Sequence, residues 1–301
     1  MISIIIPLYN PGERLKKMLD CICNQELWDY EVILVDDGST DGSGALCDTF
    51  AEKDHRFKVV HQDNKGVAAA RNRGIAVSSG CYVVFLDADD EIPKNYLSVL
   101  HKTAIETKAD IVVCDVSVIN EGNESYRFSL EPHCLSKTEA LNYLLARKRI
   151  NTGPCGKLFK RGVIDSLRFP RLRAYEDIIF VRDTFDRSLI ICTTNETEYR
   201  YISNTSGTME RFIKCPSVDI ISASEDLVCY IEKHPELSPR CMYTTLSHLY
   251  QYIREDKSVD EDVRLFNNCI KAVFKRHWKS IAKCSAFTWK EKLLFLMFGM
   301  H

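Results

Sequence analysis

Three carboxylates follow a short apolar segment in the first third of the chain. Residues 81–86 are mostly apolar, β-branched or aromatic, as in a strand buried on both faces, and Asp87, Asp89 and Asp90 come directly after them. Two aspartates one residue apart can direct both side chains to one point and offer the hard oxygen ligands that Mg²⁺ and Mn²⁺ prefer. Aspartate is also common in turns, so this segment alone does not separate a metal site from an acidic turn.

A second acidic segment ends an earlier predicted strand, because Asp36 and Asp37 follow residues 31–35. The carboxyl ends of parallel strands lie at one edge of an open sheet, so both acidic segments are expected to line one cleft. The spacing after Asp37 imitates an EF-hand, but position 12 is Asp48 rather than glutamate and a strand precedes it. No glycine-rich nucleotide loop follows the first predicted strand, so a phosphate-bearing ligand needs a bridging cation or a nearby arginine.

The elements that must position these acids alternate between strand and helix patterns. This alternation predicts a mostly parallel sheet with right-handed crossovers, flanked by helices. Predicted strands cover residues 3–7, 31–35, 57–61, 81–86 and 110–118, and predicted helices cover 14–23, 44–54, 66–77 and 94–107.

Past residue 120, strand and helix patterns no longer alternate regularly. This change predicts a second half of the domain, followed by a helical region. We predict a domain over 1–205, with a nucleotide-binding half at about 1–120 and an acceptor half at about 121–205, and a C-terminal helical region over 206–301. Short strands are expected at 126–130, 189–193 and 198–202, helices at 137–146 and 176–186, and further helices from about 214, broken near 234–235 and 257–260.

Composition narrows the class of protein. The net charge of −2 does not favour a nucleic-acid partner. Thirteen cysteines without a Cys-x-x-Cys pair favour free buried thiols in a reducing compartment over a disulfide or zinc framework. No signal-peptide pattern begins the chain, and no apolar run approaches the roughly 20 residues of a membrane span. A cytoplasmic protein is therefore expected.

Four segments in order carry a family resemblance. Together they resemble the family 2 glycosyltransferases, inverting enzymes with the GT-A fold, strongly over residues 1–120 and more weakly over 150–205. The segments are Ser-Ile-Ile-Ile-Pro-Leu-Tyr-Asn at 3–10, Val-Asp-Asp-Gly-Ser-Thr-Asp-Gly-Ser at 35–43, Asn-Lys-Gly-Val-Ala-Ala-Ala-Arg-Asn-Arg-Gly at 64–74 and Phe-Leu-Asp-Ala-Asp-Asp at 85–90.

The resemblance implies a nucleotide-sugar site at the predicted cleft. Tyr9 is expected to stack on the base and Asp37 to accept a hydrogen bond from a uracil-like N–H. Arg71 is expected near the nucleotide, with a solvated helix charge as the alternative. Asp87 and Asp89 are expected to carry the metal function, Asp89 binding the Mn²⁺ or Mg²⁺ on the diphosphate. The residues implied for the donor are Pro7, Tyr9, Asp36, Asp37, Arg71 and Asp87.

Inverting transfer also needs a base that takes the proton of the acceptor hydroxyl. The resemblance assigns this role to Asp177, with its neighbour Glu176 as the second choice. From the residues alone, acids at the start of a helix are more often caps. The chain departs from the family at Cys155 and Gly156, which puts an acceptor contact there in doubt, and it lacks the Gln-x-x-Arg-Trp signature of processive synthases.

The C-terminal segment 271–298 combines lysines, aromatic residues and a short apolar end. Across residues 271–292, seven basic residues accompany the single acid Glu291, and the apolar run 293–298 follows. This pattern fits a segment lying on an anionic membrane, and a terminal helix docked on the protein is the alternative.

We therefore predict a metal-dependent glycosyltransferase that adds one sugar from a nucleoside diphosphate, expected to be UDP, to a growing glycan. The acceptor is expected to be a lipid-linked glycan of capsule, exopolysaccharide or lipopolysaccharide synthesis, on the inner face of the cytoplasmic membrane. The alternatives are transfer to a polyprenyl phosphate and a non-catalytic nucleotide-sugar-binding scaffold of the same fold.

Overall fold

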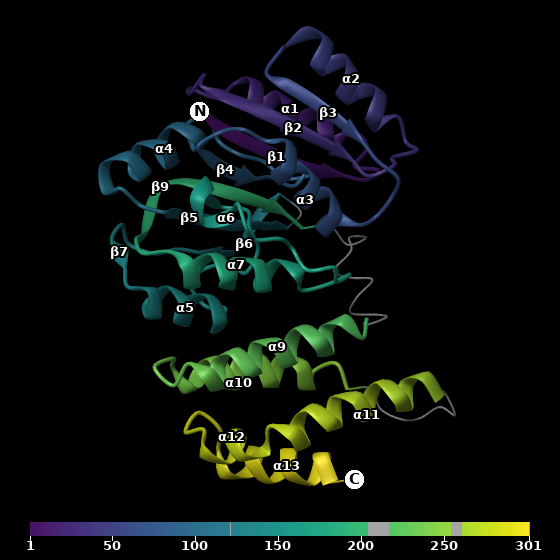
Figure 1. Cartoon of the computed structure of the whole chain (residues 1–301), viewed down its shortest axis with the longest axis vertical. Helices are drawn as coiled ribbons and strands as arrows, with labels where there is room; N and C mark the ends of the chain where they lie inside the picture. The colour runs from purple at the N-terminus through teal and green to yellow at the C-terminus, as the bar shows by residue number, and fades with distance from the viewer. Residues whose placement is uncertain (121, 204–216, 254–260, 301) are drawn as a thin grey trace.

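The computed structural model describes residues 1–120, 122–203, 217–253 and 261–300. Its centre is a sheet with the strand order β3-β2-β1-β4-β8-β5-β9-β7, with β6 added alongside β5 (Figure 1). The strands are β1 (Ile2–Leu8), β2 (Tyr30–Asp36), β3 (Phe57–His61), β4 (Tyr82–Phe85), β5 (Ile111–Asn120), β6 (Asn123–Phe128), β7 (Cys134–Leu135), β8 (Lys157–Lys160) and β9 (Ile191–Ile202).

The sheet confirms the predicted mostly parallel α/β architecture. Strands β1 to β4 pair in parallel, and β5 pairs in parallel with β9, whereas β8 runs antiparallel between β4 and β5. The prediction of two strands near 189–202 is wrong, because β9 is one strand. Its register against β5 shifts where Cys114 pairs with Thr194 and Asp115 pairs with Glu198, and this irregularity interrupts the sequence pattern.

Helices pack against the sheet. Helix α3 packs on β1 and β2, and its Gly74 is needed because an added Cβ would lie 2.3 Å from Cγ2 of Ile5. The helices of this part are α1 (Arg14–Cys23), α2 (Ser43–Lys53), α3 (Val67–Val77), α4 (Tyr96–Thr107), α5 (Lys137–Leu145), α6 (Arg161–Ile164) and α7 (Glu176–Arg187).

A cluster of four buried phenylalanines joins β4, β8 and α7. Phe85 lies within 6 Å of Phe159, Phe169 and Phe180, measured between ring centroids, and Phe169 stacks on Phe180 at 3.8 Å. Such aromatic contacts add to the free energy of burial. The cluster fixes the start of α7 relative to the end of β4. The acids predicted to bind the metal follow β4, and the predicted base lies at the start of α7.

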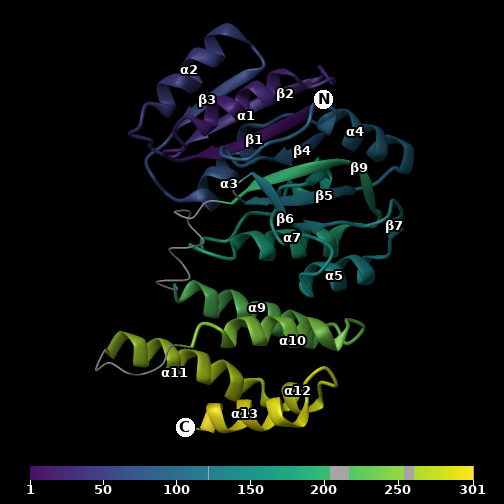
Figure 2. The same ribbon diagram turned by 180° about the vertical axis from the view of Figure 1, so that it is seen from behind.

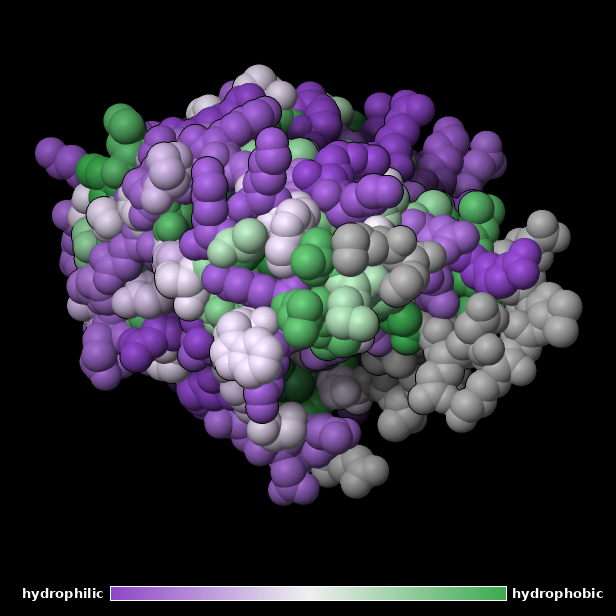
Figure 3. Space-filling model, turned by 90° about the horizontal axis from the view of Figure 1, so that it is seen from below, coloured by the Kyte–Doolittle hydropathy of each residue, from purple (hydrophilic) through white to green (hydrophobic). Residues whose placement is uncertain are grey.

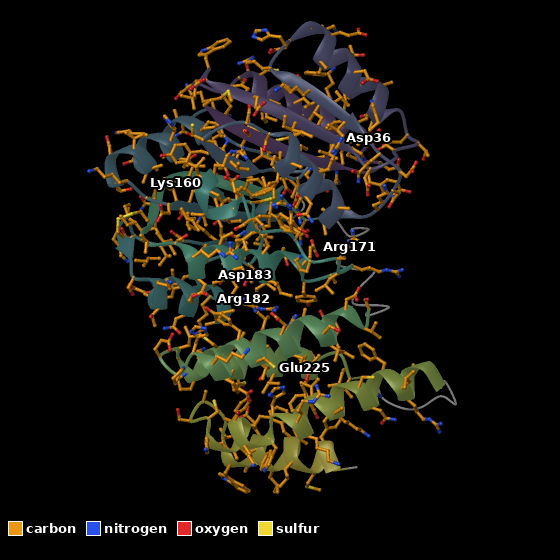
Figure 4. All side chains as sticks on the ribbon, viewed as in Figure 1. Asp36, Lys160, Arg171, Arg182, Asp183 and Glu225 are labelled. Atoms are coloured by element: carbon orange, nitrogen blue, oxygen red, sulfur yellow. A yellow bond between two sulfur atoms is a disulfide. The ribbon has the colours of Figure 1, made fainter. Side chains whose placement is uncertain are left out.

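The C-terminal helices form further layers on one side of the α/β body. Figures 1 and 2 show α9 (Asp219–Lys233) and α10 (Pro239–Tyr250) beneath α5 and α7, and α11 (Glu261–Arg276), α12 (Trp278–Lys283) and α13 (Trp289–Met300) beneath those. Arg182 of α7 lies on the side of the body that faces α9 (Figure 4). Its guanidinium pairs with Asp226 and lies 4.6 Å from the ring centroid of Tyr230, so it connects the layers. The predicted helix break at 257–260 and the predicted domain boundary at 205–206 lie outside the described residues.

The last helix has two different faces. Its Phe295 is buried against Phe274 and Tyr250, with ring centroids 4.7 and 5.2 Å apart, as a docked helix requires. The opposite face leaves Trp289 70% exposed and three further apolar side chains about half exposed. The docked-helix alternative is therefore confirmed for the buried face, and a membrane contact of the exposed face stays a prediction. Within the described ranges, no helix combines the length and apolarity needed to span a bilayer.

One cysteine pair corrects the prediction of free thiols. Cys134 and Cys192 form a disulfide, and the other cysteines in the described segments are free. The two residues are direct partners on β7 and β9, with Cα atoms 4.0 Å apart, although 58 positions separate them in sequence. Sequence spacing carries no sign of this pairing, because it arises only when the two strands meet.

Candidate active site

A buried arginine connects the two acidic motifs of the site. Arg71, on α3, donates from Nη2 to Oδ1 of Asp87 at 3.1 Å and from Nη1 to Oε1 of Glu176 at 3.0 Å. Its side chain is buried, and its guanidinium lies 5.3 Å from the ring centroid of Phe169. The alternative of a solvated helix charge is therefore wrong for Arg71. The pair of contacts brings the end of β4 and the start of α7 to one place.

The neighbours Glu176 and Asp177 have different surroundings. Glu176 is only 6% exposed and paired with Arg71, and burial raises the pKa of its carboxyl, with Asp177 adding to the rise and Arg71 opposing it. Asp177 is partly exposed; its Oδ1 accepts the N–H of Ile178 at 2.7 Å, and its Oδ2 faces Gly153. A carboxylate that exchanges protons with a substrate must reach that substrate, so the geometry favours Asp177 as the base.

Asp36 and Asp37 do not act together. Successive residues of a strand point to opposite faces, and Asp36 turns toward α2, where it binds His61 Nδ1 at 2.9 Å and the N–H of Ser39 (Figure 4). Asp37 instead accepts from Gln62 Nε2 at 2.7 Å and from the N–H groups of residues 65 and 66. Asp36 thus lies apart from the predicted cleft, whereas Asp37 orders the loop that leads into α3.

The end of β1 offers an open aromatic ring. Tyr9 is 54% exposed and follows the last residue of the strand, as a stacking platform for a base requires. Pro7 is buried within β1 and pairs with Val35. Proline fits there because the ladder between β1 and β4 ends at Ile5 and Phe85, before the missing N–H would be needed.

The three acids after β4 divide into one buried and two partly exposed side chains. Asp90 is buried, accepting bonds from the Tyr199 hydroxyl and from the N–H of Ile202 at 2.8 Å, and burial together with Asp87 raises the pKa of its carboxyl. Asp87 is 32% exposed and Asp89 41% exposed. Arg14 approaches Asp89 at 3.9 Å beside a cavity of about 50 Å³ that Lys17 also lines.

This donor set fits a divalent cation shared with a ligand. In the part of the chain that the structure describes, no three His, Cys, Asp or Glu side chains cluster as a complete metal site. Mg²⁺ typically uses one or two carboxylates together with substrate phosphates rather than an all-protein cage. Asp89, with Asp87 beside it, supplies such oxygens, and Arg14 and Lys17 supply positive charge for a diphosphate.

Sequence reasoning missed the residue that shapes the loop facing Asp177. Lys157 is completely buried, and its Nζ binds the carbonyl oxygens of Asn151 and Gly153 and Oδ1 of Asn151, at 2.6–2.9 Å. Burial lowers the pKa of this amine to about 7. Gly156 explains one departure from the family pattern, because it has φ of 75° and an added Cβ would lie 2.6 Å from Val116. The signal was a lysine at the start of a short strand whose next two residues, Leu158 and Phe159, are apolar.

Comparisons with known proteins identify the family of this chain. The family model "Glycosyl transferase family 2" matches residues 3–168. Glycosyltransferase GlyG of Streptococcus pneumoniae is 31% identical over 69% of this chain and 73% of its own length. Cholesterol galactosyltransferase of Borreliella burgdorferi is 32% identical over 66% of this chain and 59% of its own length. The chain belongs to glycosyl transferase family 2.

Solved structures agree on the fold. Residues 1–349 of S. aureus TarS in complex with UDP-GlcNAc superpose with a TM-score of 0.62 at 18% identity, over 92% of this chain and 72% of that chain. The mannosyltransferase PcManGT of Pyrobaculum calidifontis, in complex with GDP-Man and Mn²⁺, gives 0.54 at 16% identity, over 99% and 85%. The fold is the GT-A fold that the sequence predicted.

Proposed function

We propose that this protein transfers one sugar from a UDP-sugar to an acceptor hydroxyl with inversion at the anomeric carbon. The observation that carries the proposal is Arg71, which holds Asp87 and Glu176 together and so sets the metal-side acids beside the predicted base. A non-catalytic scaffold would need a donor pocket only. It would not need a partly exposed Asp177 beside a buried Glu176 that is paired with Arg71.

The proposed reaction is a single displacement. Asp177 takes the proton of the acceptor hydroxyl while that oxygen attacks the anomeric carbon, and the bond from this carbon to the diphosphate breaks on the opposite face. UDP leaves with the electron pair of the broken bond. Tyr9 binds the base by stacking, and Asp37 accepts from it with the lone pair that its three loop donors leave free. Asp89, with Asp87, would hold a divalent cation, which would offset the negative charge of the leaving diphosphate.

The direct test is metal-dependent binding of UDP by the whole chain. We expect UDP to bind with Mn²⁺ and to bind much more weakly with EDTA, by calorimetry and by a rise in melting temperature. Asp89→Asn should remove the Mn²⁺ dependence, and Asp48→Asn, an exposed acid on α2, is the matched control. Equal UDP affinity with Mn²⁺ and with EDTA would overturn the metal assignment. Screening UDP-glucose, UDP-galactose and UDP-N-acetylglucosamine then identifies the donor.

We propose a lipid-linked glycan acceptor and a peripheral position on the inner face of the cytoplasmic membrane. Trp289, Leu293, Leu294 and Met297 lie at spacings that place them on one face of α13, and all four are exposed. Lys279 and Lys283 on α12 and Lys290 on α13 are exposed as well. Figure 3 shows apolar side chains among charged ones at this end of the molecule. Apolar area framed by lysines suits the surface of an anionic bilayer.

Two tryptophans with the same exposure give a matched test of this position. Trp28, beside β2, and Trp289 are each 70% exposed. Trp289→Ser should weaken binding to phosphatidylglycerol vesicles, and Trp28→Ser should not. Added salt should also weaken binding, and phosphatidylcholine vesicles should bind less, because each lysine near an anionic surface adds roughly 1 kcal/mol. Sedimentation with neither vesicle, or concentration-dependent dimerisation through α13, would contradict the proposal.

A polyprenyl phosphate is the alternative acceptor. It would present a phosphate oxygen, which needs no base because it is already ionised at neutral pH. Transfer to a phosphate acceptor that persists in Asp177→Asn would therefore favour this alternative over a hydroxyl acceptor.

A further inference from the structure

Three ring side chains meet directly behind the predicted base. The hydroxyl of Tyr175 lies 2.6 Å from Nε2 of His248 and 2.7 Å from the hydroxyl of Tyr252. Tyr175 immediately precedes Glu176 and Asp177 in the chain, whereas His248 belongs to α10 and Tyr252 follows the end of that helix. A helix of the C-terminal region thus contacts the residue from which the catalytic helix begins.

The backbone at Tyr175 needs such support. Its φ is 65°, in the left-handed region that is uncommon for a bulky residue, and its own side chain makes no capping hydrogen bond at the start of α7. A conformation of this kind persists only where the surroundings hold it. The left-handed residue sets the direction in which α7 begins, and therefore the direction of the carboxylate of Asp177.

The side chain of Tyr175 is held on two sides. The guanidinium of Arg147, which follows α5, lies 5.4 Å from the centroid of its ring. On the other side, burial lowers the pKa of His248 to about 4, so the imidazole is neutral and has one donor and one acceptor nitrogen. The Tyr175 hydroxyl can therefore accept one hydrogen bond and donate the other to its two partners.

We propose that Tyr175 is a positioning residue: its hydroxyl, bound by His248 and Tyr252, fixes the turn that aims Asp177 at the acceptor. The C-terminal helices are then part of the catalytic apparatus rather than an appendage to it. This inference rests on the proposed role of Asp177 as the base.

The first test compares two tyrosine hydroxyls that each contact a C-terminal helix. Tyr175→Phe removes the hydroxyl behind Asp177. Tyr243→Phe removes a hydroxyl of α10 that binds Glu291 at 3.1 Å, within the C-terminal layers. With the UDP-sugars named above, Mn²⁺ and octyl β-glucoside as acceptor, Tyr175→Phe should lower kcat by about 10-fold or more, because small misplacements of a reacting group are costly. Its Kd for UDP should stay within twofold of wild type, and Tyr243→Phe should change neither value.

A conservative rescue separates positioning from packing. His248→Gln keeps a donor and an acceptor at the end of the side chain, and His248→Leu keeps bulk alone. We expect His248→Gln to retain more of the wild-type kcat than His248→Leu at matched melting temperatures. Equal kcat in the two variants, or a kcat of Tyr175→Phe equal to that of wild type, would overturn the proposal.

A measurement on the free protein needs no acceptor and separates the two hypotheses. Hydrogen exchange of the amides of residues 175–179 should be faster in Tyr175→Phe than in wild type and Tyr243→Phe. Unchanged exchange there would refute the positioning role even if no donor were turned over. If Asp177→Asn proved fully active, the base assignment would fail; if it were inactive while Tyr175→Phe matched wild type, only the positioning role would fail.

Discussion

The active site and the last two helices, α12 and α13, hold their charged groups in different ways. Around the site, Arg71, Glu176 and Lys157 are buried, and each binds named partners at fixed distances. On α12 and α13, lysines such as Lys283 and Lys290 are exposed, and aromatic rings make the internal contacts. Buried and paired charges keep one geometry, as bond-making chemistry requires. Exposed charges on flexible stems suit a surface whose contacts vary, as on a membrane.

The largest expected effect comes from replacing Asp177, the partly exposed acid of the site. Asp177→Asn keeps the size of the side chain but cannot take a proton, so turnover should fall by about 10²–10⁴-fold. The Kd for UDP, measured by calorimetry, should stay at its wild-type value because Asp177 faces the acceptor. Loss of UDP binding together with high residual turnover would instead make Asp177 a structural cap.

The largest expected loss of stability comes from breaking the buried ion pairs of Arg71 with Asp87 and Glu176. Arg71→Met leaves the carboxylates of Asp87 and Glu176 without their cation, and breaking a buried pair in this way costs about 3–5 kcal/mol. Urea unfolding measures this loss. Arg73→Met, on the exposed side of the same helix, is the control and should change the free energy of unfolding by less than about 0.5 kcal/mol. Equal losses of unfolding free energy from the two substitutions would contradict a stabilising role for the ion pairs of Arg71.

Helix α13 allows the same contrast within the C-terminal region. Phe295→Ala should cost about 3 kcal/mol, at the lower end for a buried phenylalanine, since its ring contacts Phe274 and Tyr250. Leu294→Ala, one residue earlier on the exposed face, should leave the melting temperature unchanged and weaken binding to anionic vesicles. A large loss of stability from Leu294→Ala would show that this face is covered by protein.

The smallest expected effect is a loss of stability at acidic pH. Burial would raise the pKa of Glu31, but hydrogen bonds from Lys58, Ser79 and Ser3 outweigh it and lower the pKa to about 2. The stabilisation from Glu31 is therefore complete above about pH 4.5 and lost as the pH falls toward 2. Glu31→Gln should cost about 1.5–3 kcal/mol at pH 7 and less at pH 3, by urea unfolding. Glu52→Gln, an exposed acid on α2, should show no such pH dependence.

The sequence predicted the fold and the position of the acids better than the contacts among them. Strand periodicity and four motifs in register identified the sheet and the acids at its edge. Periodicity could not separate Asp36 from Asp37, because the direction of each side chain depends on the end of β2. Only the family resemblance ranked Asp177 before Glu176, because their difference in surroundings comes from Arg71, 105 positions away from Glu176. The Cys134–Cys192 disulfide and the contact of Tyr175 with α10 were invisible for the same reason. Each joins segments that only the folded chain brings together.

Strand β8 has a consequence for the order in which the molecule assembles. Phe159 pairs with Val83 of β4 on one side and with Ile111 of β5 on the other, so β8 separates two groups of parallel strands. A nascent chain that has not yet reached Lys157 has β4 as an open sheet edge. Closing the sheet must wait for a short strand far along the chain, and such non-local pairing is slow. We therefore expect residues 1–120 to fold poorly alone, and this intermediate to be the species most prone to aggregate through its edge.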